Sequence, residues 1–203
     1  MASERWRTVK SSGRPRRGNR GFTLIEALTT ATVLGILSVG VTMLYTASLR
    51  MYTQGQREAT SRDKASLALE RILPEVREAY NVDYPGPNLI VFTLPKIGTD
   101  GHYAVDPATQ ALVAGKQVCI YQADSAGQFW SARRYVWRMD RATATAPWEN
   151  RKLIVDDVDD LSFTYAPSVD MLELVQVAIT VGQGAYPSYF DRTEVGEVFL
   201  RNH

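Results

Sequence analysis

The chain reads as one long helical pattern followed by a series of short strand-like runs. Residues Phe22–Tyr45 are apolar or small, and Glu26 is the one charged side chain among them. Apolar residues then recur at helical spacing to about Tyr80, with charged residues between them. The pattern predicts a single helix over Phe22–Ala79, which at about 1.5 Å per residue is roughly 87 Å long. Pro74 predicts either a kink in this helix or a break near its end.

Beyond the helix the periodicity changes, after a break at Asp83–Asn88 that is rich in proline and glycine. The runs that follow are compact and apolar or alternate between apolar and polar residues, as half-buried antiparallel strands do. They lie at Leu89–Leu94, Gln117–Gln122, Phe129–Met139, Leu161–Tyr165, Val175–Val181 and Val195–Leu200. We therefore predict an α+β fold, in which an antiparallel β-sheet head packs on the C-terminal half of the long N-terminal helix.

The first part of the helical pattern is long and apolar enough to cross a membrane. The 24 residues of Phe22–Tyr45 rise roughly 36 Å as a helix, against about 30 Å for a bilayer core. Seven basic residues and one acid give residues 1–21 a charge of +6, which leaves −5 of the total of +1 on the remaining chain. Basic flanks stay in the cytoplasm, so the C-terminal part is expected on the other side. A secretory signal peptide cut near Ser48 is the alternative, but its apolar region is typically about 7–15 residues long.

The boundary between the basic and apolar segments carries a specific motif, RGFTLIE, at residues 20–26. This motif resembles the prepilin leader and cleavage site of type IV pilins and type II secretion pseudopilins. The resemblance implies that a prepilin peptidase cuts after Gly21 and methylates the new amino terminus on Phe22. It also implies that Glu26 pairs with the amino terminus of a neighbouring subunit and fixes the register of assembly. The alternative for Glu26 is a local role in the first helical turn, where the helix dipole favours an acid.

The C-terminal strands are similar to those of minor pilins and J-type minor pseudopilins, in residues 158–165, 175–181 and 198–202. Major pilins commonly close their C-terminal region with a disulfide, which the single Cys119 does not allow. The chain also has no convincing match to the calcium loop of major pseudopilins. Both departures favour a minor, tip or priming subunit.

The resemblance implies four parts in the chain. They are a basic leader that is removed (1–21), a transmembrane helix (22–45), an extension of the stalk helix (46–80) and a β head (81–203). The implied function is that of a structural subunit, not an enzyme, which sits in the bacterial inner membrane with its leader cytoplasmic and its head periplasmic before it joins a pseudopilus or pilus. The implied partners are the prepilin peptidase, other major and minor pilins or pseudopilins, and the inner-membrane assembly platform. The alternative is a single-pass membrane-anchored binding or enzymatic domain outside any filament.

The remaining sequence offers little material for catalysis or metal binding. It has one cysteine and two histidines, and it lacks a G-x-S-x-G elbow, a phosphate-binding glycine loop and an H-E-x-x-H motif. We therefore expect no catalytic, cofactor-binding or metal-binding residues, and an unreactive Cys119 within an apolar strand. The acidic run Asp156–Asp160 is interpreted as a solvated turn rather than a calcium site, because strand alternation would scatter its oxygens.

Basic residues interleave with aromatic ones over Trp130–Arg141. This pattern is found in proteins that hold single-stranded DNA by stacking and phosphate contacts. We interpret it instead as a strand with one packed aromatic face and one solvated charged face. Nucleic acid is not an expected partner, because the mature chain is acidic overall.

Overall fold

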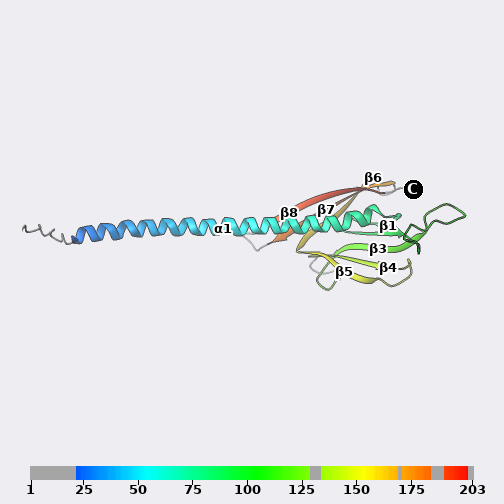
Figure 1. The fold of residues 1–203 in the computed structure, drawn as a ribbon, viewed down its shortest axis with the longest axis horizontal. Coiled ribbons are helices and arrows are strands. Elements are labelled where there is room, and N and C mark those ends of the chain that lie inside the picture. Colours follow the sequence, from blue (N-terminus) through cyan, green and yellow to red (C-terminus); the bar gives the residue numbers. More distant parts are fainter. Residues whose placement is uncertain (1–21, 129–133, 169–170, 184–189, 201–203) are drawn as a thin grey trace, which may run out of the picture. The chain divides into compact units, whose positions relative to one another are not determined.

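The computed structural model describes residues 22–128, 134–168, 171–183 and 190–200. These residues form one helix and eight strands, and Figure 1 shows the long helix with the strands gathered at its C-terminal part. The chain divides into two compact units, residues 1–48 and 49–203, and the boundary lies inside the helix. The predicted α+β fold is confirmed, because the C-terminal part of a long N-terminal helix packs against antiparallel sheets.

Helix α1 spans Leu24–Arg77, 54 residues in all, and so begins and ends close to the predicted bounds. Thr23 precedes its first turn, and the Thr23 Oγ1 accepts a hydrogen bond from the Glu26 amide at 3.3 Å, as the side chain of an N-cap residue does. Pro74 lies inside the last turns of the helix, which ends at Arg77. Of the two outcomes expected for Pro74, the structure shows a helix end close behind it.

In the first unit the helix is exposed along its whole described length. Its most apolar window has a mean hydropathy of 1.9, and α1 is the one described helix long and apolar enough to cross a membrane. Threonine hydroxyls in this segment donate to carbonyls of the preceding turn: Thr30 Oγ1 to Glu26 O at 2.7 Å, and Thr42 Oγ1 to Ser38 O at 2.8 Å. These polar groups are therefore satisfied within the helix, as an apolar surrounding requires.

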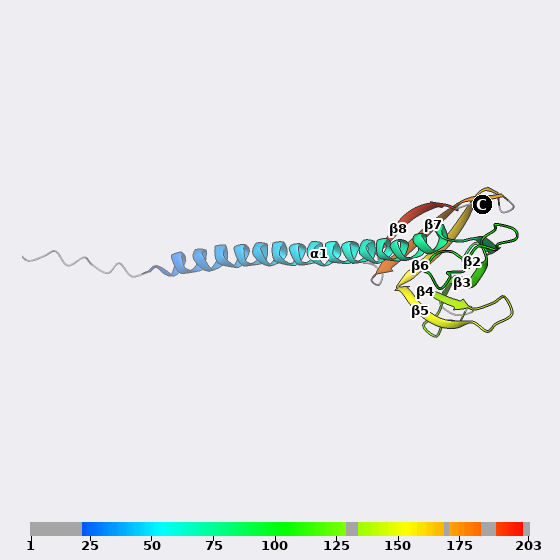
Figure 2. The same ribbon diagram turned by 45° about the vertical axis from the view of Figure 1, so that its right-hand side comes forward.

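The strands of the second unit form two antiparallel sheets, where the sequence predicted one. The five-stranded sheet has the order β1-β2-β3-β4-β5, and the three-stranded sheet has the order β6-β7-β8. Strand bounds are β1 Asn81–Pro85, β2 Leu89–Pro95, β3 Ala114–Ala123, β4 Tyr135–Arg141, β5 Glu149–Asp156, β6 Val158–Ser168, β7 Met171–Gln183 and β8 Phe190–Phe199. Figures 1 and 2 show β7 and β8 on one side of the C-terminal part of α1, and β4 and β5 on the other.

The C-terminal part of α1 packs through a stripe of small and apolar side chains. The buried helix residues are Ser61, Ala65, Ala68, Leu69, Ile72 and Val76. The five apolar residues among them form one core with the inner faces of both sheets, including Phe92 of β2 and Ile179 of β7. Strand β8 comes close to the helix at Gly196, where a Cβ atom would lie 2.5 Å from the Leu73 Cδ1. Glycine therefore permits this close approach.

A second apolar cluster lies on the opposite face of the five-stranded sheet. Cys119 and Tyr121 of β3 are buried there, with Trp137 of β4 packed against them. Because Val118 and Ile120 on the inner face of β3 are also buried, this central strand is covered on both faces. Strand β3 therefore differs from the half-buried pattern expected for most of the strands, and it corresponds to the compact apolar run at Gln117–Gln122.

A buried glutamine joins the two sheets. Gln122 of β3 is 2% exposed, and its Nε2 donates to the Val158 carbonyl at 3.3 Å. Its Oε1 accepts a hydrogen bond from the Leu161 amide at 3.2 Å. The Asn88 Nδ2 adds a bond to the Leu161 carbonyl at 3.0 Å. The start of β6 is thus fixed against the five-stranded sheet by side-chain amides as well as by apolar packing.

The sequence pattern did not predict the two edge strands of the larger sheet. Strand β1 overlaps the start of the expected break, and its Asp83 is tolerated because Thr93 Oγ1 (2.6 Å) and Gln117 Nε2 (2.9 Å) donate to the carboxylate. Strand β5 is polar and mostly exposed, and β4 is its one neighbour in the described sheet. The expected strand at Phe129–Met139 is seen as β4, which begins at Tyr135, and residues 129–133 lie outside the described part.

Candidate functional site

The predicted site residues at the N-terminal junction lie at the start of the described chain. Gly21 lies outside the described residues, Phe22 is exposed, and Glu26 lies in the first turn of α1. The Thr23 Oγ1 accepts a hydrogen bond from the Glu26 amide, and it also donates a hydrogen bond to the Glu26 Oε2 at 3.4 Å. This reciprocal arrangement resembles a capping box, and it places the carboxylate at the positive end of the helix dipole.

The contacts of Glu26 leave part of its carboxylate available. Thr23 is the one described residue that bonds to the carboxylate, and it bonds to a single oxygen. The local role expected for an acid in the first turn is therefore present, and the second oxygen is open to a donor from another chain. A role of Glu26 in the register of assembly stays a prediction.

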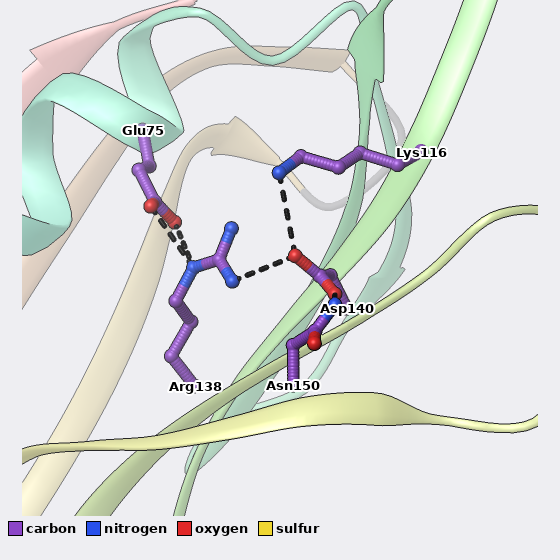
Figure 3. A network of polar contacts seen from close by, with 5 residues as sticks. All are labelled: Glu75, Lys116, Arg138, Asp140 and Asn150. Atoms are coloured by element: carbon purple, nitrogen blue, oxygen red, sulfur yellow. Dashed lines mark hydrogen bonds and ion pairs between the residues drawn. The ribbon is translucent and has the colours of Figure 1, made fainter.

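A network of charged side chains occupies the head where α1 passes the inner face of β3, β4 and β5 (Figure 3). The Arg138 Nε donates to both Glu75 carboxylate oxygens at 2.9 Å, and its Nη1 donates to the Asp140 Oδ2 at 2.9 Å. Asp140 also accepts from Lys116 Nζ at 3.3 Å and from Asn150 Nδ2 at 2.7 Å. The Arg138 and Asp140 side chains are only 12% and 10% exposed.

Burial and hydrogen bonding shift the pKa values of Arg138 and Asp140 in opposite directions. Burial lowers the pKa of Arg138, but the bonds to Asp140 and Glu75 raise it above its ordinary value. Burial raises the pKa of Asp140, but the bonds from Asn150, Arg138 and Lys116 lower it below the ordinary 3.8. Both groups therefore stay charged at neutral pH, and each charge is held by the other.

A groove of about 700 Å³ opens over this network. Its lining also includes Arg71 of α1 and residues Lys152, Leu153 and Ile154 of β5. Arg71 Nη1 donates to the Ile154 carbonyl at 3.1 Å, where the pairing of β4 with β5 shifts register. The helix and the edge strand are thus tied together at one end of the groove.

This network was not predicted from the sequence, whose pattern of basic and aromatic residues led us to expect Arg138 on a solvated face. That interpretation is wrong, because Arg138 lies on the inner face beside buried Val136 and Asp140. The outer face instead carries Trp137 with Arg141, whose guanidinium stacks over the Trp148 ring at 4.3 Å from its centroid. The alternation of side chains along a strand could have indicated this position, since it places residues 136, 138 and 140 on one face. Trp130 and Arg133 lie outside the described residues.

The acidic run Asp156–Asp160 is not a single solvated turn. Strand β5 ends at Asp156 and β6 begins at Val158, so only Asp157, with a φ of 58°, lies between them. The Lys64 Nζ of α1 binds Asp156 and Asp157 at 2.7 Å each. Among the residues that the structure describes, no group of three or more His, Cys, Asp or Glu side chains is arranged to hold a metal ion.

The thiol of Cys119 should react very slowly in the folded protein. The side chain is buried, and burial raises its pKa to about 12, although Arg141 acts in the opposite direction. The thiolate is the reactive form, so we expect maleimide labelling at pH 8 to be at least about 100-fold slower in native protein than in urea-unfolded protein. Mass spectrometry of timed samples measures both rates, and equal rates would contradict a buried, protonated thiol.

Comparison with protein families identifies the N-terminal segment. Residues 16–42 match the family model described as the prokaryotic N-terminal methylation motif. No curated protein and no solved structure matches the chain. The match includes Gly21, Phe22 and Glu26, which confirms the prepilin-type signal predicted from the sequence. With the long helix packed on antiparallel sheets, the chain is pilin-like in both its signal and its fold.

Proposed function

We propose that this pilin-like chain is a minor pilin or minor pseudopilin, a structural subunit that assembles through its N-terminal helix into a type IV pilus or a type II secretion pseudopilus. A prepilin peptidase cuts after Gly21 and methylates Phe22. The methylation motif at residues 16–42 and the α+β fold support this proposal. Pilin-like proteins are generally structural, so the chain is given no enzymatic role.

The observation that carries the proposal is the contrast in burial along α1. Every described residue from 22 to 60 is exposed, including large apolar side chains such as Leu24 and Ile36. The first buried helix residue is Ser61. Exposed apolar surface costs about 25 cal/mol per Å², so this segment needs lipid or other helices around it. Cleavage on its cytoplasmic side leaves the apolar helix on the product, which then moves from lipid into a bundle of sister helices.

The charge distribution supports an orientation in the inner membrane. The basic leader, residues 1–21, stays in the cytoplasm, and the head lies in the periplasm. The inner-membrane assembly platform then draws the mature subunit into the filament beside other major and minor subunits. As in other pilus systems, a cytoplasmic ATPase is the proposed source of energy, and the chain itself carries no phosphate-binding glycine loop.

A place at the tip or in a priming complex fits the chain better than a place in the bulk filament. The sequence has one cysteine, Cys119, and therefore lacks the internal disulfide common in major pilins. Cys119 is instead buried in the outer cluster of the five-stranded sheet. A subunit present in few copies at the tip is not required to carry that reinforcement of the shaft.

Replacement of Gly21 by valine should leave the precursor unprocessed. The peptidase subsite is expected to enclose the residue before the cut tightly, and glycine is the one residue without a side chain. Mass spectrometry of membrane-extracted protein should show the wild type starting at methylated Phe22, and the variant starting at Met1. Gly18→Val is the matched control, because it places the same side chain elsewhere in the leader and should be processed normally.

Two outcomes of this experiment would reject the proposal. Normal processing of Gly21→Val would show that the cut lies elsewhere. A wild-type chain that starts at Met1, or near Ser48, would instead favour a single-pass membrane-anchored domain outside any filament.

A further inference from the structure

The groove over the charged network of the head is lined by more cationic than acidic side chains. Four cations and two acids line it: Arg71, Lys116, Arg138, Lys152, Glu75 and Asp140. Glu75 and Asp140 are both engaged by Arg138, and Asp140 also by Lys116. Arg71 and Lys152 form no ion pair with any described residue. The groove is therefore a local positive site on a chain that is acidic beyond its leader.

Arg138 presents an unused donor to this groove. Its Nε and Nη1 are held by Glu75 and Asp140, whereas its Nη2 bonds to no described residue. Figure 3 shows Nη2 directed into the space between Glu75 and Lys116. Three short bonds fix the guanidinium in advance, so a ligand would meet an oriented donor without ordering the side chain itself.

The edge strand gives the groove an apolar wall beside its charges. Ile154 of β5 lines the groove, is partly exposed and packs against the core. The pairing of β4 with β5 shifts register on both sides of Lys152, and Asn150 has a φ of 50°. Such irregularities redirect side chains at sheet edges, and they are over-represented beside functional sites.

We propose that this groove binds an acidic segment of a partner polypeptide. Carboxylates of that segment meet Lys152, Arg71 and the Arg138 Nη2, and an apolar side chain of the segment packs on Ile154. A volume of about 700 Å³ suits several residues of a peptide and greatly exceeds one inorganic anion. The inference concerns the head alone and goes beyond the proposed function, because it holds whether or not the helix joins a filament.

A nucleic acid fits this groove less well than an acidic peptide. The lining contains no aromatic residue, so bases would have no platform on which to stack. Glu75 and Asp140 lie within the groove and repel a continuous phosphate backbone. Carboxylates separated by apolar residues avoid both problems, since each carboxylate reaches a cation separately and the apolar residues between them pack on Ile154.

The test uses the full-length protein in detergent and a fluorescein-labelled peptide, Asp-Leu-Glu-Asp-Leu-Glu, with binding followed by fluorescence anisotropy. We expect Lys152→Glu to weaken binding at least about tenfold, because the reversal places like charges together. Lys96→Glu changes the net charge equally at a residue outside the groove lining, and it should bind like the wild type. Lys152→Gln should lie between the two, and it remains informative if the charge reversal disturbs the fold.

Each other outcome counts against the proposal. Absence of peptide binding, or equal losses in Lys152→Glu and Lys96→Glu, would show that the groove does not recognise the acidic segment. Competition by inorganic phosphate at concentrations similar to those of unlabelled peptide would identify a small-anion site instead. Tighter binding of an oligothymidylate than of the peptide would identify a nucleic-acid site. Because detergent-solubilised monomers are used, failure here leaves the filament proposal standing, and a wrong start at Phe22 leaves this one standing.

Discussion

Replacement of Glu26 by alanine should reduce incorporation into filaments at least tenfold while leaving membrane insertion intact. A carboxylate at the centre of a bilayer costs about 2.5–3.5 kcal/mol, less near the interface, and a loss of about 1.4 kcal/mol per subunit is already tenfold. Under the proposed register role, the methylated amine of a neighbouring Phe22 offsets this cost only in the correct axial position, and Glu26→Ala leaves that amine without its counter-charge. The protein should appear in the membrane fraction and be missing from sheared filaments, as immunoblots of both fractions would show.

Thr23 provides the control that separates register from local capping. Thr23→Ala removes both side-chain contacts to Glu26 but keeps its charge. Loss of an N-cap costs about 1 kcal/mol of helix stability, and incorporation should stay close to that of the wild type. If Thr23→Ala blocks assembly as strongly as Glu26→Ala, the carboxylate acts through the helix start. Normal incorporation of Glu26→Ala would reject the register role.

Replacement of Arg138 by methionine should destabilise the head by about 3–5 kcal/mol, because it leaves Asp140 and Glu75 without their main counter-charge. Asp140 is almost buried, so solvent replaces little of the lost interaction. Methionine keeps an unbranched apolar stem, which limits the loss of packing. Thermal unfolding followed by tryptophan fluorescence should show a melting temperature lower by about 10 °C, given about 2–4 °C per kcal/mol for a domain of this size.

An exposed ion pair between α1 and β8 supplies the matched control. Arg62 lies 3.8 Å from Glu194 and its side chain is 67% exposed, so Arg62→Met should cost less than about 1 kcal/mol. The effect of Arg138→Met should also depend on pH. Because the folded-state pKa of Asp140 lies below the ordinary 3.8, its stabilising contribution is complete above that value and is lost as pH falls through the folded pKa. A pH-independent difference, or equal losses in the two variants, would contradict the network.

The features predicted correctly from the sequence depend on residues close together in the chain. The helix follows from repeated apolar spacing, and the buried positions Ala65, Leu69, Ile72 and Val76 fall on that spacing. The methylation motif is likewise continuous, at residues 16–42. Neither prediction required knowledge of which distant segments lie side by side.

The features that were missed depend on distant partners. Asp83 indicates a turn when taken alone, and it becomes a strand residue because Thr93 and Gln117 supply donors. Arg138 indicates a solvated strand face, and its actual partner, Glu75, is 63 positions away on the helix. The two sheets are linked by Gln122 of β3, whose contacts at Val158 and Leu161 lie on β6. Local periodicity contains none of this information.

The side-chain amide of Gln122 couples the five-stranded and the three-stranded sheet mechanically. The Nε2 and the Oε1 of this amide both bond to β6. Separating the two sheets would therefore leave a donor and an acceptor without partners in an apolar interior. Each buried donor or acceptor left without a hydrogen bond costs about 1–3 kcal/mol of stability. A force applied to either sheet is therefore transmitted to the other, and we expect the two sheets of the head to resist sliding past one another under shear.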